Sequence, residues 1–153
     1  MAGYAAGTEV PAERTQAELV TLLRKRGADS IAAGMTQDAG VIQFEAEGRQ
    51  VRFTVPMPDP ASRPITHSKT GIVRTDNQVR TARAAEERRR WRALLLVVRA
   101  KFEAIDSEIV TFEAEFLAQT VLPDNQTVLD HVREPIARAY IEGHVRPLLQ
   151  LGN

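Results

Sequence analysis

Residues 91–116 read WRALLLVVRAKFEAIDSEIVTFEAEF, and this stretch decides the fold. Its large apolar residues recur at spacings that alternate between four and three: Trp91, Leu95, Val98, Phe102, Ile105, Ile109, Phe112 and Phe116. Only a helix places side chains with this spacing on one line. Because no glycine or proline occurs between Gly71 and Pro123, the pattern predicts one long helix from Asp76 to about Ala118. A continuous helix would be about 60 Å long, more than the width of a small domain, so the alternative is a helix with a break or a protruding end.

A β-hairpin is predicted on either side of Gly48-Arg49, which we expect to form a two-residue II′ turn. The register then pairs Phe44 with Phe53 and Glu45 with Arg52. The alternation gives one apolar face, made of Ile42, Phe44, Ala46, Val51, Phe53 and Val55. This face needs a cover, so the heptad stripe either packs on it or pairs with another copy of the chain.

The remaining patterns complete an α+β fold. We expect an N-terminal helix over residues 12–26, a strand over 30–35, and a C-terminal helical region from about 127 to 142. The predicted fold is an N-terminal helix, a three-stranded antiparallel meander, one long heptad-patterned helix packed on it, and a C-terminal helical region that Pro135 either kinks or divides. The length favours a single domain, 1–153.

Three segments of this domain read as irregular. Residues 1–11 are expected to form a loose N-terminus and residues 143–153 a tail. Pro56, Pro58, Pro60 and Pro64 end the hairpin strand, and residues 57–75 are expected to form a long, mobile, basic loop. A loop of this length inside a small domain is usually functional or disordered.

Composition narrows the class of protein. There are no cysteines, which excludes a disulfide scaffold and a cysteine nucleophile. No stretch approaches the roughly 20 apolar residues of a membrane span, and the N-terminus lacks the pattern of a signal peptide. We therefore expect a cytoplasmic protein with no membrane partner.

The formal net charge of zero hides an uneven distribution. Residues 60–92 contain nine basic and three acidic side chains, so this segment carries +6 and the remainder −6. The candidate nucleic-acid-binding residues are Arg63, Lys69, Arg74, Arg80, Arg83, Arg88, Arg89, Arg90 and Arg92, with Trp91 as the only aromatic residue among them. A localised basic segment is typical of a nucleic-acid interface, and the alternative is a solvated helix face beside a loop.

No catalytic or metal-binding motif is apparent. The three histidines, His67, His131 and His144, do not lie at metal-ligand spacing. The run Ser68–Gly71 lacks the glycine pattern of a phosphate-binding loop. We predict no catalytic residue, no metal and no cofactor, and therefore a protein that is not an enzyme.

Several segments resemble a family of small, uncharacterised tailed-phage proteins. They are GRQVRFTVPMP at 48–58, RWRAL at 90–94, FEAEFL at 112–117 and VLPD at 121–124. The resemblance covers residues 4–149 and implies no activity. In the order of its elements alone, the chain is similar to phage single-strand annealing proteins of the beta/RecT type, which hold single-stranded DNA in a basic groove and form rings or filaments.

These observations lead to one functional hypothesis and one alternative. The first is non-enzymatic binding or annealing of single-stranded DNA in phage recombination or replication, by a homo-oligomer. The oligomer is expected to use some of Phe102, Ile105, Ile109, Phe112 and Phe116 to meet a second subunit or the sheet. The alternative is a phage accessory or anti-defence protein that binds a host protein through its basic region.

Overall fold

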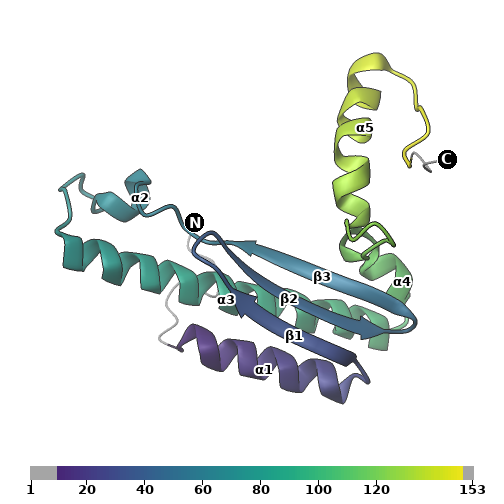
Figure 1. Cartoon of the computed structure of the whole chain (residues 1–153), viewed down its shortest axis with the longest axis horizontal. Coiled ribbons are helices and arrows are strands. Elements are labelled where there is room, and N and C mark those ends of the chain that lie inside the picture. Colours follow the sequence, from purple (N-terminus) through teal and green to yellow (C-terminus); the bar gives the residue numbers. More distant parts are fainter. Residues whose placement is uncertain (1–9, 150–153) are drawn as a thin grey trace.

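A computed structural model describes residues 10–149. Two helices pack on one face of a three-stranded antiparallel sheet, and another helix projects from one end (Figure 1). The elements are α1 (Ala12–Lys25), β1 (Asp29–Met35), β2 (Ala39–Ala46), β3 (Arg49–Pro56), α2 (Arg63–Thr66), α3 (Asp76–Asp106), α4 (Phe112–Glu115), the 3-10 helix η1 (Leu117–Gln119) and α5 (Val128–Glu142). This order confirms the predicted α+β fold. Most of the predicted loose N-terminus, 1–11, and the end of the 143–153 tail lie outside the described residues.

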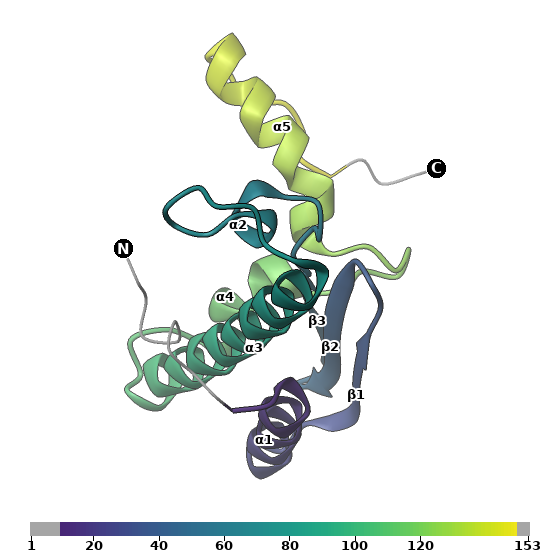
Figure 2. The same ribbon diagram turned by 90° about the vertical axis from the view of Figure 1, so that its left-hand side faces the viewer.

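The sheet has one covered face and one open face. Figure 2, turned by 90° from Figure 1, shows α1 and α3 on the same side of the strands. The buried side chains of this layer include Phe44 and Phe53 from the sheet and Leu19 and Leu23 from α1. Glu45 is exposed on the opposite face, as the alternation predicts.

The turn of the hairpin differs from the predicted one. Glu47 and Gly48, not Gly48-Arg49, form the two-residue loop, with positive φ angles of 51° and 71°. Two positive φ angles are the signature of a I′ turn rather than a II′ turn. Phe44 therefore lies opposite Val51 instead of Phe53. This shift of two residues preserves the side-chain period, so Ile42, Phe44, Val51, Phe53 and Val55 still face the core.

The predicted cross-strand ion pair is absent as a consequence of this register. Arg52 lies opposite Gln43, and its Nε donates to Oε1 of Gln43 at 2.9 Å. Its guanidinium group also donates to the backbone carbonyl of Asn125 at 3.1 Å. Arg52 thus links the sheet to the segment before α5 instead of pairing with Glu45.

The long helix α3 covers the sheet with the first part of the predicted stripe. Its buried residues are Trp91, Leu94, Leu95, Val98 and Phe102. The intramolecular interpretation of the stripe is therefore correct for this part of the chain. Ile105 completes the contact as a partly buried neighbour of the core.

The helix does not continue to Ala118, because α3 ends at Asp106, and the alternative of a break is therefore correct. Glu108 adopts a left-handed conformation with φ of 59°. The N–H of Ile109 donates to the carbonyl of Ala104, and the N–H of Glu108 to that of Ile105, which is a Schellman ending without glycine. Ile109 lies in this turn and is 79% exposed, so it leaves the stripe.

The chain then folds back so that Phe116 still reaches the core. Phe116 is fully buried, and its ring centroid lies 4.6 to 6.1 Å from those of Phe112, Phe102, Phe44 and Phe53. The apolar periodicity therefore identified Phe116 as a core residue through the wrong backbone path.

The C-terminal helix α5 begins with a capping box between Thr127 and Asp130 and is followed by Gly143 with φ of 74°. It continues through Pro135 without interruption. None of its residues is buried, and its principal neighbour is η1. In both views it stands away from the sheet and α3 (Figures 1 and 2).

Candidate nucleic-acid interface

The nine candidate basic side chains lie on two neighbouring segments, 57–75 and the N-terminal half of α3. The segment 57–75 contains the short helix α2 and an isolated β-bridge between His67 and Val73. It leads into α3 through a capping box in which Thr75 accepts from the N–H of Gln78. The short helix α2 packs against α3, and Arg74 of the loop lines the same cavity as Arg89 and Arg90 of α3.

Glu86 engages two of the candidate arginines. Arg89 donates to its carboxylate from Nη2 at 2.5 Å and from Nε at 2.8 Å, and Arg90 donates from Nε at 2.9 Å. The hydrogen bond from Arg89 is the largest cause that lowers the pKa of Glu86 to about 2; burial opposes it, and the hydrogen bond from Arg90 and the charges of both arginines lower the pKa further. This carboxylate offsets part of the positive charge in the centre of the basic segment.

Arg83 and Arg92 connect α3 to other elements. Arg83 donates from Nη2 to the carbonyl of Gln37 at 2.7 Å and forms an ion pair with Glu87 at 3.6 Å. Arg92 forms an ion pair with Glu18 of α1 at 3.2 Å. Both arginines therefore hold the fold together, a role that the sequence did not reveal because Gln37 and Glu18 are distant along the chain.

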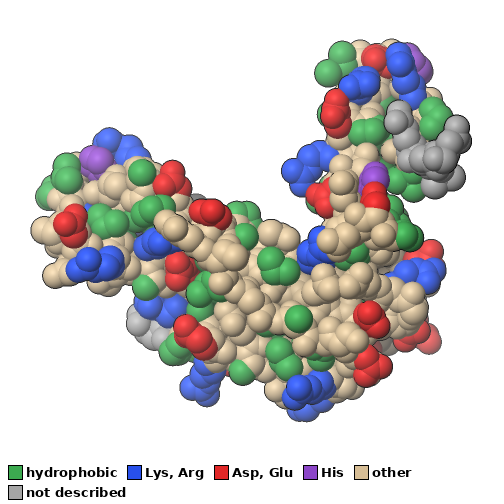
Figure 3. Space-filling view, in the orientation of Figure 1, with side chains coloured by type: hydrophobic (Ala, Val, Ile, Leu, Met, Phe, Trp, Pro, Cys, Tyr) green, Lys and Arg blue, Asp and Glu red, His purple; other side chains and the backbone are tan. Residues whose placement is uncertain are grey.

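Four of the predicted residues form what we call the basic lobe: Arg63, Lys69, Arg74 and Arg80. Within residues 10–149, none of the four has an ion-pair partner. Nη1 of Arg74 donates to the carbonyls of Pro64 and Ile65 at 2.8 and 3.0 Å, and Arg80 donates to Oδ1 of Asn77. The end of the molecule that carries these residues is one of two projections, with α5 as the other, on either side of a hollow (Figure 3).

The last two candidates, Arg88 and Trp91, are less accessible to a ligand than the lobe residues. Arg88 is half-buried, and its Nε is buried without a hydrogen-bond partner in the described part of the chain. Trp91 is fully buried against the sheet. Its ring is closed to any ligand, so the prediction that Trp91 contributes to the interface is wrong. The heptad pattern itself contained the reason, because Trp91 is the first residue of the stripe.

A groove lies between the loop and the first turns of α3. Its volume is about 580 Å³, and its lining includes Arg74 together with the apolar side chains of Ile72 and Val73. Ile72 and Val73 are 69% and 70% exposed. Sequence reasoning missed this apolar pair, because two residues in a loop show no periodicity.

The titratable side chains of the described residues that could support chemistry do not gather at the basic lobe. No group of three or more histidine, aspartate or glutamate side chains in residues 10–149 could hold a metal ion. The histidines are separate: His67 contacts Thr66 at 2.8 Å, whereas His131 contacts Asp124 at 2.5 Å. No helix of residues 10–149 has the length and apolar character to cross a membrane. No protein family, curated protein or solved structure matches the chain.

Proposed function

We propose that the protein binds nucleic acid, with the basic lobe in contact with backbone phosphates. The observation that carries the proposal is the clustering of Arg63, Lys69, Arg74 and Arg80 at one end of the molecule without an acidic partner in the described residues. Cationic side chains that the protein does not neutralise itself can bind phosphates. Their binding releases the counterions that surround the nucleic acid. The proposed role is binding alone, with no chemical step.

Single-stranded DNA is the proposed ligand, and its annealing in phage recombination or replication is the proposed role. Within residues 10–149, the one strongly exposed aromatic side chain is Tyr140, which belongs to α5 and not to the lobe. Base stacking, which strengthens many single-strand complexes, is therefore not available at the lobe. Affinity would come from phosphate contacts and would fall steeply with salt.

The test replaces three lobe residues and leaves Arg74, which supports the loop, in place. The triple variant Arg63→Gln, Lys69→Gln and Arg80→Gln removes three positive charges at the lobe. The control, Arg14→Gln, Arg24→Gln and Lys25→Gln, removes three exposed cations from α1, which have no partner in residues 10–149. Affinities for single-stranded and duplex oligonucleotides are measured over a salt series.

The proposal expects the lobe variant to bind more weakly than the control at every salt concentration. Each lost phosphate contact should reduce the slope of log affinity against log salt by roughly 0.7–0.9. Equal losses in the two variants would mean that net charge alone matters and would contradict a site at the lobe. Tighter binding of duplex than of single strands would contradict the proposed ligand.

A protein partner is the second candidate, and the exposed pair Ile72 and Val73 favours it. Apolar side chains in the middle of a basic surface suit an acidic and apolar protein surface better than a phosphate backbone. This candidate corresponds to a phage accessory protein that binds a host protein through its basic region. The protein-partner candidate replaces nucleic-acid binding if the wild-type protein retards no oligonucleotide in a gel-shift assay at about 50 mM salt. Electrostatic binding is strongest at such low salt.

A further inference from the structure

The two ends of α3 carry charges of opposite sign. Residues 60–85, which include the basic lobe, contain five basic side chains and one acidic side chain, Asp76. Residues 103–115, which we call the acidic end, contain five acidic side chains and no basic one. The 31 residues of α3 span about 45 Å and hold the two regions at opposite ends of the molecule (Figure 1). The basic lobe therefore cannot contact the acidic end of its own chain.

The acidic end presents unpaired carboxylates beside an apolar side chain. Three of its five carboxylates form ion pairs within the chain. The other two, those of Glu103 and Glu108, are exposed and have no partner in residues 10–149. Ile109 follows Glu108 in the turn that ends α3 and is 79% exposed. The residues that the structure does not describe contain no basic side chain that could neutralise these two carboxylates.

The basic lobe presents the complementary surface. Its groove of about 580 Å³ is lined in part by Ile72 and Val73, which are 69% and 70% exposed. Lys69 and Arg80 are exposed next to this groove, and no acidic side chain of residues 10–149 lines it. Among the residues that the structure does not describe, only Glu9 is acidic, so they can neutralise at most one of the four cations of the lobe.

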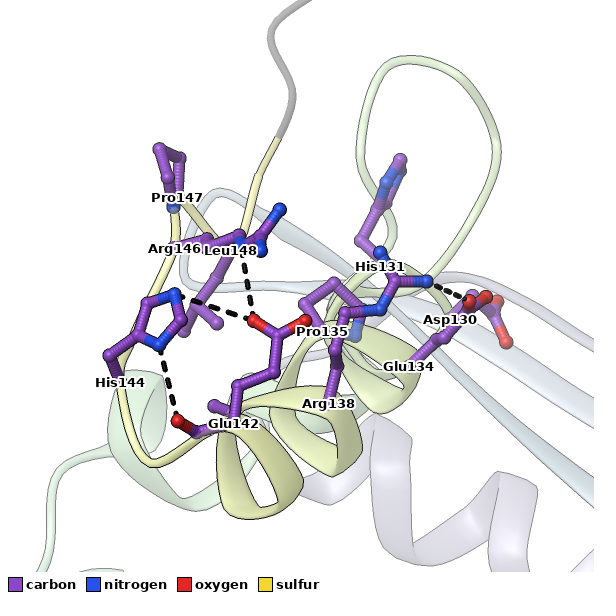
Figure 4. A pocket seen from close by; sticks show the side chains of 11 residues that line it. Asp130, His131, Glu134, Pro135, Arg138, Glu142, His144, Arg146, Pro147 and Leu148 are labelled. Atoms are coloured by element: carbon purple, nitrogen blue, oxygen red, sulfur yellow. Dashed lines mark hydrogen bonds and ion pairs between the residues drawn. The ribbon is translucent and has the colours of Figure 1, made fainter.

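The other projection of the molecule, α5, is a poorer counterpart for the lobe. One of its three carboxylates takes part in the capping box that begins the helix. Glu134 pairs with Arg138 at 2.6 Å, and Glu142 pairs with Arg146 at 3.0 Å and contacts His144 at 3.4 Å (Figure 4). The carboxylates of α5 are therefore already engaged within their own chain.

From this charge complementarity we infer that the turn at residues 107–110 of one copy docks in the groove of the basic lobe of a second copy. Ile109 meets Ile72 and Val73 in this contact, while Glu103 and Glu108 face the cations of the lobe. The second copy thus supplies the acidic and apolar surface that the groove suits. Because the two surfaces differ, the contact is heterologous and continues from copy to copy unless a ring closes.

The contact should be weak and sensitive to salt. Exposed ion pairs contribute little individually, and salt screens them. We expect self-association at high micromolar protein in about 50 mM salt and a monomer in about 500 mM salt. The lobe cations are also those proposed to bind phosphates, so nucleic acid and a second copy would be alternative occupants. The inference does not depend on nucleic-acid binding, because its tests contain no polynucleotide.

Charge reversal tests the pairing of the two surfaces. The lobe-reversed protein carries Lys69→Glu and Arg80→Glu, and the end-reversed protein carries Glu103→Lys and Glu108→Lys. Each protein alone brings like charges together, which should weaken self-association in sedimentation velocity by at least about tenfold. An equimolar mixture should recover the association, because the opposed surfaces of the two proteins again differ in sign. No recovery in the mixture, or a wild-type monomer at low salt, would overturn the inference.

The matched control reverses two exposed cations outside the lobe, Arg14→Glu and Arg133→Glu. This variant has the same net charge as the lobe-reversed protein and should keep the self-association of the wild type. Equal weakening in the two variants would show that net charge alone matters, and would also overturn the inference.

Disulfide cross-linking provides a measurement without charge variants, since the chain contains no cysteine. Ile72→Cys and Ile109→Cys replace exposed side chains, so neither change should disturb the fold. Oxidation of their mixture should give a covalent dimer in about 50 mM salt that is largely lost in about 500 mM salt. The control mixture pairs Ile72→Cys with Ile141→Cys, at a residue of α5 that is 86% exposed, and should give little dimer. Equal yields in the two mixtures, or an equal yield from the Ile109→Cys protein alone, would contradict docking in the groove.

Discussion

The indole ring of Trp91 in α3 packs directly on the backbone of Gly40 in β2. A Cβ atom on Gly40 would overlap Cζ2 of Trp91 and would lie 3.1 Å from Cε of Met57. Gly40 has an ordinary strand conformation, so it is required for the space it leaves rather than for its flexibility. This contact sets how closely the long helix approaches the sheet.

Gly40→Ala should therefore destabilise the protein by about 1–3 kcal/mol, the usual cost of overpacking a core. Gly34→Ala is the matched control, since it lies in the neighbouring strand with nothing within 4 Å of the added Cβ. The control should change the free energy of unfolding by less than about 0.5 kcal/mol. Urea denaturation measures both, and equal effects would show that Trp91 does not pack on Gly40.

The end of α3 can be tested by the sign of one substitution. Glu108→Gly should stabilise the protein by about 0.5–1 kcal/mol, because glycine adopts the left-handed conformation of Glu108 without strain. In an uninterrupted helix the same change would cost about 0.8–1.0 kcal/mol. A loss of stability in chemical denaturation would support the continuous helix that the periodicity predicts.

Phe116 and Ile109 belong to the same heptad pattern but should respond differently to truncation. Phe116→Ala should cost about 3–5 kcal/mol, because it empties the centre of the aromatic cluster. Ile109→Ala should cost less than about 0.5 kcal/mol, since Ile109 is 79% exposed. Similar losses at the two positions, measured by thermal and urea unfolding, would rule out the observed turn.

The hairpin turn offers a similar comparison. Glu47→Asn should stabilise the protein by roughly 0.5 kcal/mol, because Asn-Gly is the preferred pair in a I′ turn. Arg49→Asn should be destabilising, since Arg49 is the first residue of β3 and asparagine is disfavoured in strands. If Arg49→Asn were stabilising and Glu47→Asn destabilising in urea denaturation, the result would support the predicted II′ turn at Gly48-Arg49.

Glu86 should contribute to stability in a defined pH range. Its pKa is lowered from 4.5 to about 2, so its contribution is complete above pH 4.5 and is lost as the pH falls through 2. Glu86→Gln should lower stability at neutral pH by at most about 1 kcal/mol, since the site is partly exposed, and the difference should vanish near pH 2.

Glu103→Gln is the control for Glu86, because Glu103 is exposed and its side chain has no partner in residues 10–149. Urea midpoints recorded across the acid range should be nearly the same for this control and the wild type. A pH-independent difference between Glu86→Gln and the wild type would contradict the role assigned to the pairs with Arg89 and Arg90.

The candidate site was predictable in composition but not in geometry. The charge count located the basic segment, and the structure leaves Arg63, Lys69 and Arg80 there without acidic partners in the described residues. The charge count of the sequence could not show that Arg92 pairs with Glu18, because these residues lie 74 positions apart. The sequence also could not show the groove beside Ile72, because this groove forms only when the loop folds against α3.

The sequence by itself determined the class of fold and the core, because both depend on local periodicity. A period of two over the strands and a heptad stripe from Trp91 identified most of the core, although Ile109 of the stripe is exposed. The tertiary structure decided where the chain turns, since nothing in the local pattern disfavours a helix at Glu108. The helix stops there because Phe116 is buried among Phe44, Phe53 and Phe102 only if the chain reverses.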